Sequence, residues 1–529
     1  MRSPHGLDSL TIYGHRLLQE IRTEADSLRL DQEKLRLMLP TLQVHLLCGT
    51  RNPVNNLLRS TIGYTFDQLH LDLDSSPAEG LTGDGHLYTL NTGAILLDTI
   101  QWDITQDPQG VALRSRITNG RRNRVVSFQS SFLARLTATG ATAHLDFIDA
   151  KGKKGVDLGI EAKMTREGTQ LHMTPLNPII AYRRFTLNED NYVELTREGR
   201  VLALVDLLAD DGTGLKLYST PNENALQDIS LSLNNINMAE LTSVMPYAPQ
   251  LGGLLHGDLH YMQADSATTI STDIGIRRMT YEGTPMGDMG LNTIYFPNTD
   301  GSHHVDAVVT QNDNEIAMLA GTYWEQNGEG QIDAEATLES LPLSLANAFL
   351  PEGTIHLKGA TSGSLTITGR AANPLMTGSL ATEGVHVLAE DYSVDLSIPD
   401  DTLRVNNSYL DLDRIEAYAA GKSPLTIDGS INFSDLDNIR LSLDLAAKKY
   451  KLIDAPQSHT ALAYGKVYVD MNARAWGTLN DLKVRGRLAV LGNTDVTYVL
   501  RDSPITVQDQ LSDIVTFCDF ADTTQVQTV

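Results

Sequence analysis

Two neighbouring segments decide the fold: residues 341–351 read LPLSLANAFLP, and residues 363–369 read GSLTITG. Proline is tolerated at the first position of a helix and cannot continue one, so Pro342 and Pro351 bracket a predicted helix of about two turns. Leu345 and Phe349 share a face of that helix at a four-residue spacing. In the second segment apolar and polar residues alternate, as they do along a strand with one buried face. We therefore predict a short plug helix followed by a β-meander, in which residues 355–357 form one short strand and residues 365–367 the next.

The same block recurs upstream, more weakly, at an offset of about 105 residues. Residues 245–246 (MP) correspond to 350–351 (LP), and residues 257–261 (GDLHY) correspond to 363–367 (GSLTI). Downstream, residues 465–469 (GKVYV) repeat the same strand pattern. Repeats at a long period are typical of arrays. We expect four regions: residues 1–225, a β-meander; 226–340, a repeat with a short helix; 341–440, a repeat with the plug helix; and 441–529, the start of a further region that is cut short.

Alternation extends along most of the chain. The apolar run Val201–Leu208, bounded by Gly199 and by the turn residues 210–212 (DDG), predicts a strand that enters a hairpin. Near the N-terminus, leucines at 28, 30, 35, 37 and 39 flank a polar turn and predict another hairpin. Residues 14–25 are left open, because Leu17, Leu18 and Ile21 also have helical spacing.

These patterns predict an all-β fold. Roughly ten residues per strand and turn give on the order of 50 strands, whereas open sheets rarely exceed about 10 strands without splitting or curling. We therefore expect a long curled β-sheet, open on one side like a groove, built of repeated β-meanders with one or two short plug helices. Each strand would have one apolar and one polar face, and the alternation alone leaves open what covers the apolar face.

Composition limits the class of protein. The net charge of −25 disfavours nucleic acid as a partner. The two cysteines, Cys48 and Cys518, exclude a disulfide framework and a thiolate metal cluster. No window approaches the ~18 apolar residues of a membrane span, and the first residues lack the apolar core of a signal peptide. We expect either a cytoplasmic protein or a piece of a longer one.

The residues that could bind a metal ion or a phosphate are better explained by structural or solvent-exposed roles. His303 and His304 are adjacent, so on a strand they point to opposite faces and do not converge on a metal. Asp72 with Asp74, and likewise Asp411 with Asp413, could bind calcium, but calcium recruits six or more oxygens and solvated carboxylates are favoured. Two basic clusters, Arg121–Arg124 and Arg183–Arg184, could contact lipid phosphates, although solvated side chains are favoured there too. We find no catalytic motif, and we expect no enzyme activity, no metal and no cofactor.

Several of these motifs carry a family resemblance. They are the 341–351 helix, the 363–369 strand, residues 373–378 (NPLMTG), 245–249 (MPYAP), 253–257 (GLLHG) and 491–498 (LGNTDVTY). With them the chain resembles the TamB family (translocation and assembly module subunit) of the AsmA-like group, most closely its Bacteroidota members. The resemblance covers most of the chain and is weakest before residue 190. It implies a periplasmic protein, anchored in the inner membrane when full length, whose apolar groove carries phospholipid acyl chains to the outer membrane and supports outer-membrane integrity.

A second view of that family makes it a module for assembling or secreting outer-membrane proteins with an Omp85-type barrel. Both ends of this chain depart from the family pattern, so we expect a fragment. A different class also remains, an extracellular β-solenoid that is an adhesin or acts on polysaccharide. Such solenoids repeat every ~20–30 residues, and the period of about 105 together with only three tryptophans favours the scaffold. The predicted groove residues are Leu365, Ile367, Val385, Val387, Leu441, Leu443, Leu445, Val467 and Val469.

Overall fold

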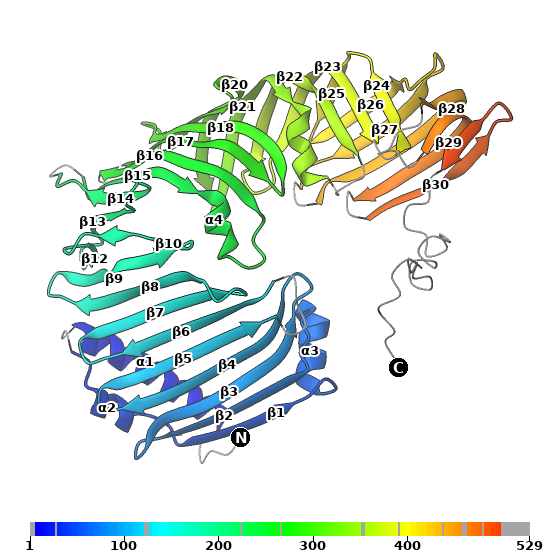
Figure 1. Ribbon diagram of the computed structural model, residues 1–529. Helices are drawn as coiled ribbons and strands as arrows, with labels where there is room; N and C mark the ends of the chain where they lie inside the picture. The colour runs from blue at the N-terminus through cyan, green and yellow to red at the C-terminus, as the bar shows by residue number, and fades with distance from the viewer. Residues whose placement is uncertain are drawn as a thin grey trace, which may run out of the picture. The chain divides into compact units, whose positions relative to one another are not determined.

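The computed structural model describes residues 6–26, 29–120, 126–222, 225–264, 267–350, 355–389, 392–435, 438–456, 463–478 and 481–498. Strands make up 68% and helices 10% of it. The strands belong to one open antiparallel sheet of 31 strands that is not closed into a barrel (Figure 1). This confirms the predicted all-β class with few helices.

The chain divides into two compact units, Met1–Ala336 and Thr337–Val529. The first contains α1 (Leu7–Asp26), α2 (Gln32–Leu37), α3 (Pro53–Ile62) and α4 (Met238–Ser243). Its strands are β1 (Leu42–Cys48), β2 (Gln68–Ser76), β3 (Gly80–Asn91), β4 (Leu96–Asp107), β5 (Gly110–Asn119), β6 (Phe128–Leu136), β7 (Gly140–Asp149), β8 (Lys154–Met164), β9 (Gly168–Ile180), β10 (Arg183–Arg184), β11 (Thr186–Leu187), β12 (Tyr192–Thr196), β13 (Val201–Leu208), β14 (Gly214–Ser219), β15 (Gln227–Asn237), β16 (Leu251–Ala264), β17 (Ala267–Tyr281), β18 (Thr284–Pro297), β19 (His303–Gln311) and β20 (Asn314–Gln326).

Strand β21 (Glu329–Pro342) crosses the division between the units. The second unit then contains the 3₁₀ helix η1 (Leu343–Phe349) and ten strands: β22 (His356–Arg370), β23 (Leu375–Ala389), β24 (Val394–Ile398), β25 (Thr402–Asn406), β26 (Tyr409–Ala417), β27 (Leu425–Asn432), β28 (Arg440–Ala455), β29 (Ala463–Thr478), β30 (Asp481–Val490) and β31 (Asp495–Tyr498).

The N-terminal region corrects one prediction. The hairpin expected across residues 28–39 is wrong, because Leu35 and Leu37 lie in helix α2. The Asp31 side chain caps this helix by accepting hydrogen bonds from the backbone N–H groups of Glu33 and Lys34, both at 3.1 Å. Residues 14–25 lie in α1, so the helical alternative is the one the structure has. Residue 28 lies outside the described residues.

The repeat near residue 341 has a structural counterpart upstream. Helix α4 begins at Met238 and η1 at Leu343, a difference of 343 − 238 = 105 residues, and the strands that follow begin at Leu251 and His356, again 105 apart. Both predicted short helices are therefore present, although η1 is a 3₁₀ helix and Pro342 ends the strand before it. The two short strands expected across residues 355–367 are instead one strand, β22, which contains 15 residues.

A glycine occupies the same place in both repeats. Gly257 on β16 has φ +136°, and Gly363 on β22 has φ +150°. A Cβ atom on Gly257 would lie 2.1 Å from the carbonyl oxygen of Asp273, and one on Gly363 would lie 2.1 Å from that of Ser379. Any side chain would collide with the neighbouring strand, so each position requires glycine.

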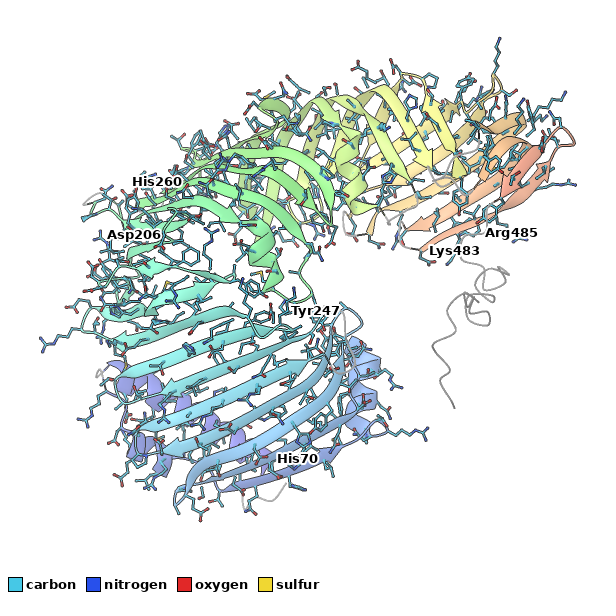
Figure 2. All side chains as sticks on the ribbon, viewed as in Figure 1. His70, Asp206, Tyr247, His260, Lys483 and Arg485 are labelled. Carbon is cyan, nitrogen blue, oxygen red and sulfur yellow. The ribbon has the colours of Figure 1, made fainter. Side chains whose placement is uncertain are left out.

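In the first unit, the segment that follows α4 packs back against much earlier strands. Val244 contacts the buried cluster of Phe128, Phe147 and Val156. The hydroxyl of Tyr247 (labelled in Figure 2) donates to the carbonyl oxygen of Leu96, 151 residues away. These contacts anchor the segment that follows α4 to the earlier strands of the unit.

Candidate functional site

The nine predicted groove residues lie on four strands of the second unit. Leu365 and Ile367 are on β22, Val385 and Val387 on β23, three leucines on β28, and Val467 and Val469 on β29. Leu365, Val385 and Val469 are buried, and the other six are half-buried. The structure brings the β28 and β29 residues together on paired strands.

Strand register defines one continuous face across β26–β30. Residues directly opposite one another in an antiparallel pair point to the same side of the sheet, so the pairing assigns each side chain to a face. We call this surface the apolar face. It carries Leu410, Leu412, Ile415 and Ala417 on β26; Leu425, Ile427, Gly429 and Ile431 on β27; Leu441, Leu443, Leu445 and Ala447 on β28; Val469, Met471, Ala473, Ala475 and Gly477 on β29; and Leu482, Val484, Gly486, Leu488 and Val490 on β30.

The apolar face continues toward the start of the unit. Val405 on β25, which is 2% exposed, pairs with Leu410 on one side and with Gly378 of β23 on the other. Gly378 in turn pairs with Leu365 of β22. The face therefore runs from β22 to β30 without a charged side chain at these paired positions.

One end of the apolar face is closed by packing. Ala417, Leu425, Ala447, Tyr450 and Val469 form a buried cluster. The Tyr450 side chain is fully buried, and its hydroxyl donates a 3.2 Å hydrogen bond to the carbonyl oxygen of Ala417. Burial raises the pKa of Tyr450 to about 12, because the phenolate would lose its hydration there.

The other end of the apolar face is open to solvent. On β30 the exposed fractions are 48% for Leu482, 64% for Val484, 61% for Leu488 and 63% for Val490. Strand β30 pairs with β29, and the structure describes no strand on its other edge. This row was not among the predicted groove residues, although Leu482, Val484, Leu488 and Val490 recur at even spacing around Gly486 and so have the same alternation.

The opposite face of β30 is basic. Lys483, Arg485 and Arg487 alternate with the apolar row, and Figure 2 shows the first two on this strand. Arg485 is paired directly with Arg474 of β29. Lys483 lies 3.6 Å from Asp481 on the same face. Like charges placed opposite one another repel, so an anion beside Arg474 and Arg485 would relieve the repulsion between them.

The basic side also bears a hollow of about 730 Å³. Two aromatic residues, Tyr409 and Trp476, and two arginines, Arg440 and Arg474, are among the residues that line it. Arg474 donates a 3.2 Å hydrogen bond to Ser442 and lies 3.9 Å from Asp444. Most of its lining residues lie on the polar side of the sheet, and Leu441 and Gly477, which belong to the apolar face, also line it.

Of the other residues singled out by the sequence, the two adjacent histidines have structural partners. His303 stacks on Tyr295 with ring centroids 4.9 Å apart, and His304 contacts Asp306 at 2.8 Å, so the adjacent histidines take different neighbours. Asp74, Asp411 and Asp413 are exposed. The Arg121–Arg124 cluster lies outside the described residues.

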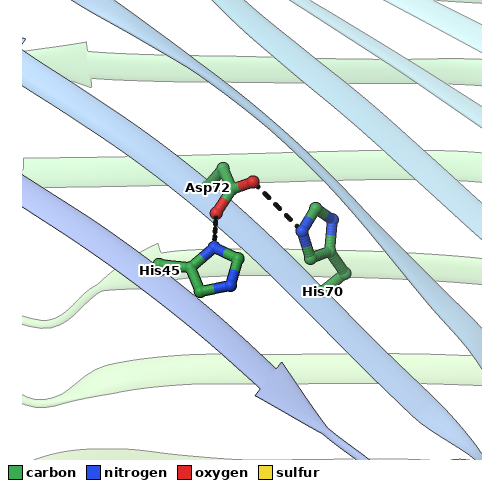
Figure 3. A group of neighbouring side chains, drawn as sticks. All are labelled: His45, His70 and Asp72. Atoms are coloured by element: carbon green, nitrogen blue, oxygen red, sulfur yellow. Dashed lines mark hydrogen bonds and ion pairs between the residues drawn. The ribbon is translucent and has the colours of Figure 1, made fainter.

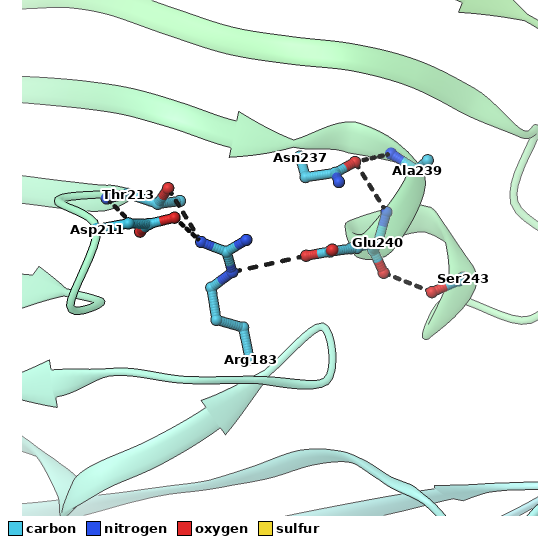
Figure 4. A network of polar contacts seen from close by, with 7 residues as sticks. All are labelled: Arg183, Asp211, Thr213, Asn237, Ala239, Glu240 and Ser243. Carbon is cyan, nitrogen blue, oxygen red and sulfur yellow. Dashed lines mark hydrogen bonds and ion pairs between the residues drawn. The ribbon is translucent and has the colours of Figure 1, made fainter.

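Arg183 belongs to a polar network in the first unit (Figure 4). Its guanidinium donates to Asp211 at 2.6 Å and to Thr213 at 3.1 Å, and it lies 3.7 Å from Glu240 of α4. The hydrogen bond from Arg183 lowers the pKa of Asp211 to about 2, helped by bonds from Thr213. This arginine therefore ties α4 to the β13–β14 turn.

Comparison of the chain with protein-family models, curated proteins and solved structures finds no match. None of the described helices combines the length and the apolar character needed to cross a bilayer.

Proposed function

We propose that the apolar face of the second unit holds phospholipid acyl chains, and that the protein is a non-enzymatic scaffold that carries phospholipid between two membranes. The observation that carries this proposal is the exposed row of β30, Leu482 to Val490, which continues a face that is buried or half-buried on the neighbouring strands. Exposed apolar surface of this kind is characteristic of interaction sites rather than of free solvated strands.

The dimensions of the row suit an acyl chain. Eight residue steps separate Leu482 from Val490, and at about 3.4 Å per step the row is roughly 27 Å long. One leaflet accounts for half of the ~30 Å hydrocarbon core of a bilayer, so the row exceeds the length of one acyl chain. Each methylene removed from water on this surface contributes about 0.8 kcal/mol.

The resemblance to TamB proteins supplies the biological setting of the proposal. In that setting the protein lies in the periplasm, is held at the inner membrane by an anchor in the full-length protein, and delivers lipid toward the outer membrane. Its support of outer-membrane integrity would follow from that delivery. The predicted groove residues Leu441, Leu443 and Leu445 continue the apolar face away from the β30 edge.

The second candidate function is assembly or secretion of outer-membrane proteins with an Omp85-type barrel. The observation that favours it is the edge of β30, whose backbone groups are available to an incoming strand that would add to the sheet. An adhesin or polysaccharide-acting solenoid has less support, because solenoid coils stack in parallel and the pairs described here are antiparallel.

Site-specific photo-crosslinking tests the lipid proposal. A photoreactive amino acid is placed at Val484 or Leu443 on the apolar face, and at Ser442 or Arg485 on the polar face as matched controls. We expect phospholipid adducts, identified by mass spectrometry, from the first pair alone. Equal labelling of both pairs refutes the proposal, and crosslinks to an outer-membrane polypeptide from Val484 support the assembly function instead.

A further inference from the structure

A second cluster of interest lies in the first unit, on the polar face of β1 and β2. His45 of β1 pairs directly with Asp72 of β2, and His70 precedes Asp72 by two residues on the same strand. Opposite residues and residues two apart share a face, so the three side chains converge on one side of the sheet. Figure 3 shows the Asp72 carboxylate between the two imidazole rings.

The contacts within the cluster bring three ligand atoms close together. One Asp72 oxygen bonds to Nδ1 of His45, and the other lies 3.1 Å from Nε2 of His70. One ring nitrogen of each histidine and one carboxylate oxygen of Asp72 all lie within 4.8 Å of one another. Ligands of tetrahedral zinc, with bonds of about 2.0–2.1 Å, are separated by about 3.3 Å, so small side-chain adjustments suffice.

We propose that His45, His70 and Asp72 form a binding site for a divalent transition-metal ion, with Zn²⁺ as the fitting cation. Two imidazoles and one carboxylate are ligands that zinc accepts, whereas calcium and magnesium require a shell of oxygens. His45 is 72% exposed and Asp72 37% exposed, so an ion bound there keeps an open position for water or another ligand.

Neighbouring rings hold His70 in place. His86 of β3 pairs directly with His70, and their ring centroids are 5.0 Å apart. His86 in turn lies against Tyr88, at 4.6 Å between centroids. Only 22% of the His70 side chain is exposed, so this ligand is positioned before an ion arrives.

A second His–Asp cluster provides an internal comparison. His144, Asp146 and Asp157 also lie close together, but Lys154 places its ammonium 2.9 Å from Asp146 and 2.8 Å from Asp157. That lysine already supplies the positive charge that a metal would bring. Among the described residues no lysine or arginine forms an ion pair with Asp72, whose ion-pair partners are His45 and His70.

Zinc titration of the untagged full chain, freed of metal with a chelator, tests the proposal. Isothermal calorimetry and equilibrium dialysis with metal analysis would measure Zn²⁺ alone, and visible absorption of Co²⁺ would report the ligand geometry. We expect His45→Ala, His70→Ala and Asp72→Asn each to weaken Zn²⁺ binding at least tenfold, and His144→Ala to leave it unchanged. Bound zinc should also raise the thermal midpoint of the wild type, because it ties β1 to β2.

Failure of the wild type to bind Zn²⁺ stoichiometrically at micromolar concentrations overturns the site. So does unchanged binding by His45→Ala, or loss of binding in His144→Ala. Circular dichroism checks that each variant is folded. If Asp72→Asn unfolds, His45→Ala decides the question, because that side chain is exposed and its removal leaves the sheet intact.

Discussion

Placing charges on the exposed apolar row of β30 tests the proposed lipid surface most directly. The variant Val484→Lys with Leu488→Lys places two ammonium groups on the apolar face, at positions that are 64% and 61% exposed. Fully burying a Val or Leu side chain contributes about 1.5–3 kcal/mol, and these two are little more than one-third buried. We therefore expect the pair to cost roughly 1–2 kcal/mol of stability and the protein to remain folded.

The same change should weaken lipid binding far more than it weakens folding. A lysine ammonium stays hydrated, so an acyl chain cannot lie across it without an unpaired charge losing water. If three methylenes lose contact at about 0.8 kcal/mol each, the loss is about 2.4 kcal/mol, which corresponds to roughly 60-fold in affinity.

The assay measures transfer of a fluorescent phospholipid from vesicles to the purified protein. The matched control is a double variant on the opposite face of β30, which combines Arg485→Ala and Arg487→Ala. We expect strong loss of lipid binding in the lysine variant and retention in the alanine variant. Equal binding by the lysine variant and the wild type refutes the reasoning. Equal loss in both variants would show that binding requires the basic row as well as the apolar row, and would contradict binding through the apolar row alone.

Three further changes have defined outcomes. Leu443→Arg places a charge on the half-buried part of the apolar face, but the long side chain can extend to solvent. We therefore expect a folded full-length protein that fails to restore detergent and vancomycin resistance to a strain that depends on it. Outright unfolding, seen by circular dichroism, would mean that this face is a closed core. Gly363→Ala should lower the free energy of unfolding, measured by denaturant titration, by about 2 kcal/mol or more, because the new Cβ would lie 2.1 Å from a backbone carbonyl oxygen. The control Ser364→Ala, at an exposed position, should change the free energy of unfolding by less than about 0.5 kcal/mol. Equal effects of the two variants would contradict the steric argument. The hydrogen bond from Arg183 lowers the pKa of Asp211 in the folded state from 3.8 to about 2, so the stabilisation by this carboxylate is present above pH ~4 and is lost as the pH falls toward 2. Asp211→Asn should flatten this part of the stability–pH curve. An unchanged curve would show that the ion pair does not contribute to this pH dependence.

Much of the sheet was predictable because alternation is a local signal. Strand β13 was predicted from its apolar run between turn residues, and it spans Val201–Leu208 as expected. The N-terminal helices were harder, because leucines at 35 and 37 fit an alternating pattern as well as a helix. Asp31 decides between these possibilities through its capping bonds, a signal that the leucine spacing hides.

The candidate sites were less predictable for a different reason. Alternation assigns Leu443 to a face, but whether that face is covered depends on which strand lies beside it, and sequence pattern does not give strand neighbours. The same limit applies to His45 and Asp72, which are 27 residues apart and meet only through the β1–β2 register. Single-residue register is set by tertiary pairing and not by local propensity.

The basic row of β30, Lys483, Arg485 and Arg487, disfavours pairing of this edge strand with a second copy of itself. A long exposed edge strand with an apolar face is a template for pairing with a second copy of itself. Antiparallel pairing of two such edges about Arg485 would set the arginines of both copies opposite one another, with Lys483 of each copy facing Arg487 of the other. Like charges directly opposite destabilise a strand pair, so the row disfavours self-association on the edge. An acyl chain meets no such penalty, because it contacts the apolar side and makes no strand hydrogen bonds. The alternation of β30 therefore disfavours a second copy as its occupant and is compatible with the proposed lipid. Removing the charge with Lys483→Ser, Arg485→Ser and Arg487→Ser should produce concentration-dependent oligomers in analytical ultracentrifugation that the wild type does not form. A triple variant that sediments like the wild type would show that the edge is protected by something other than its charge.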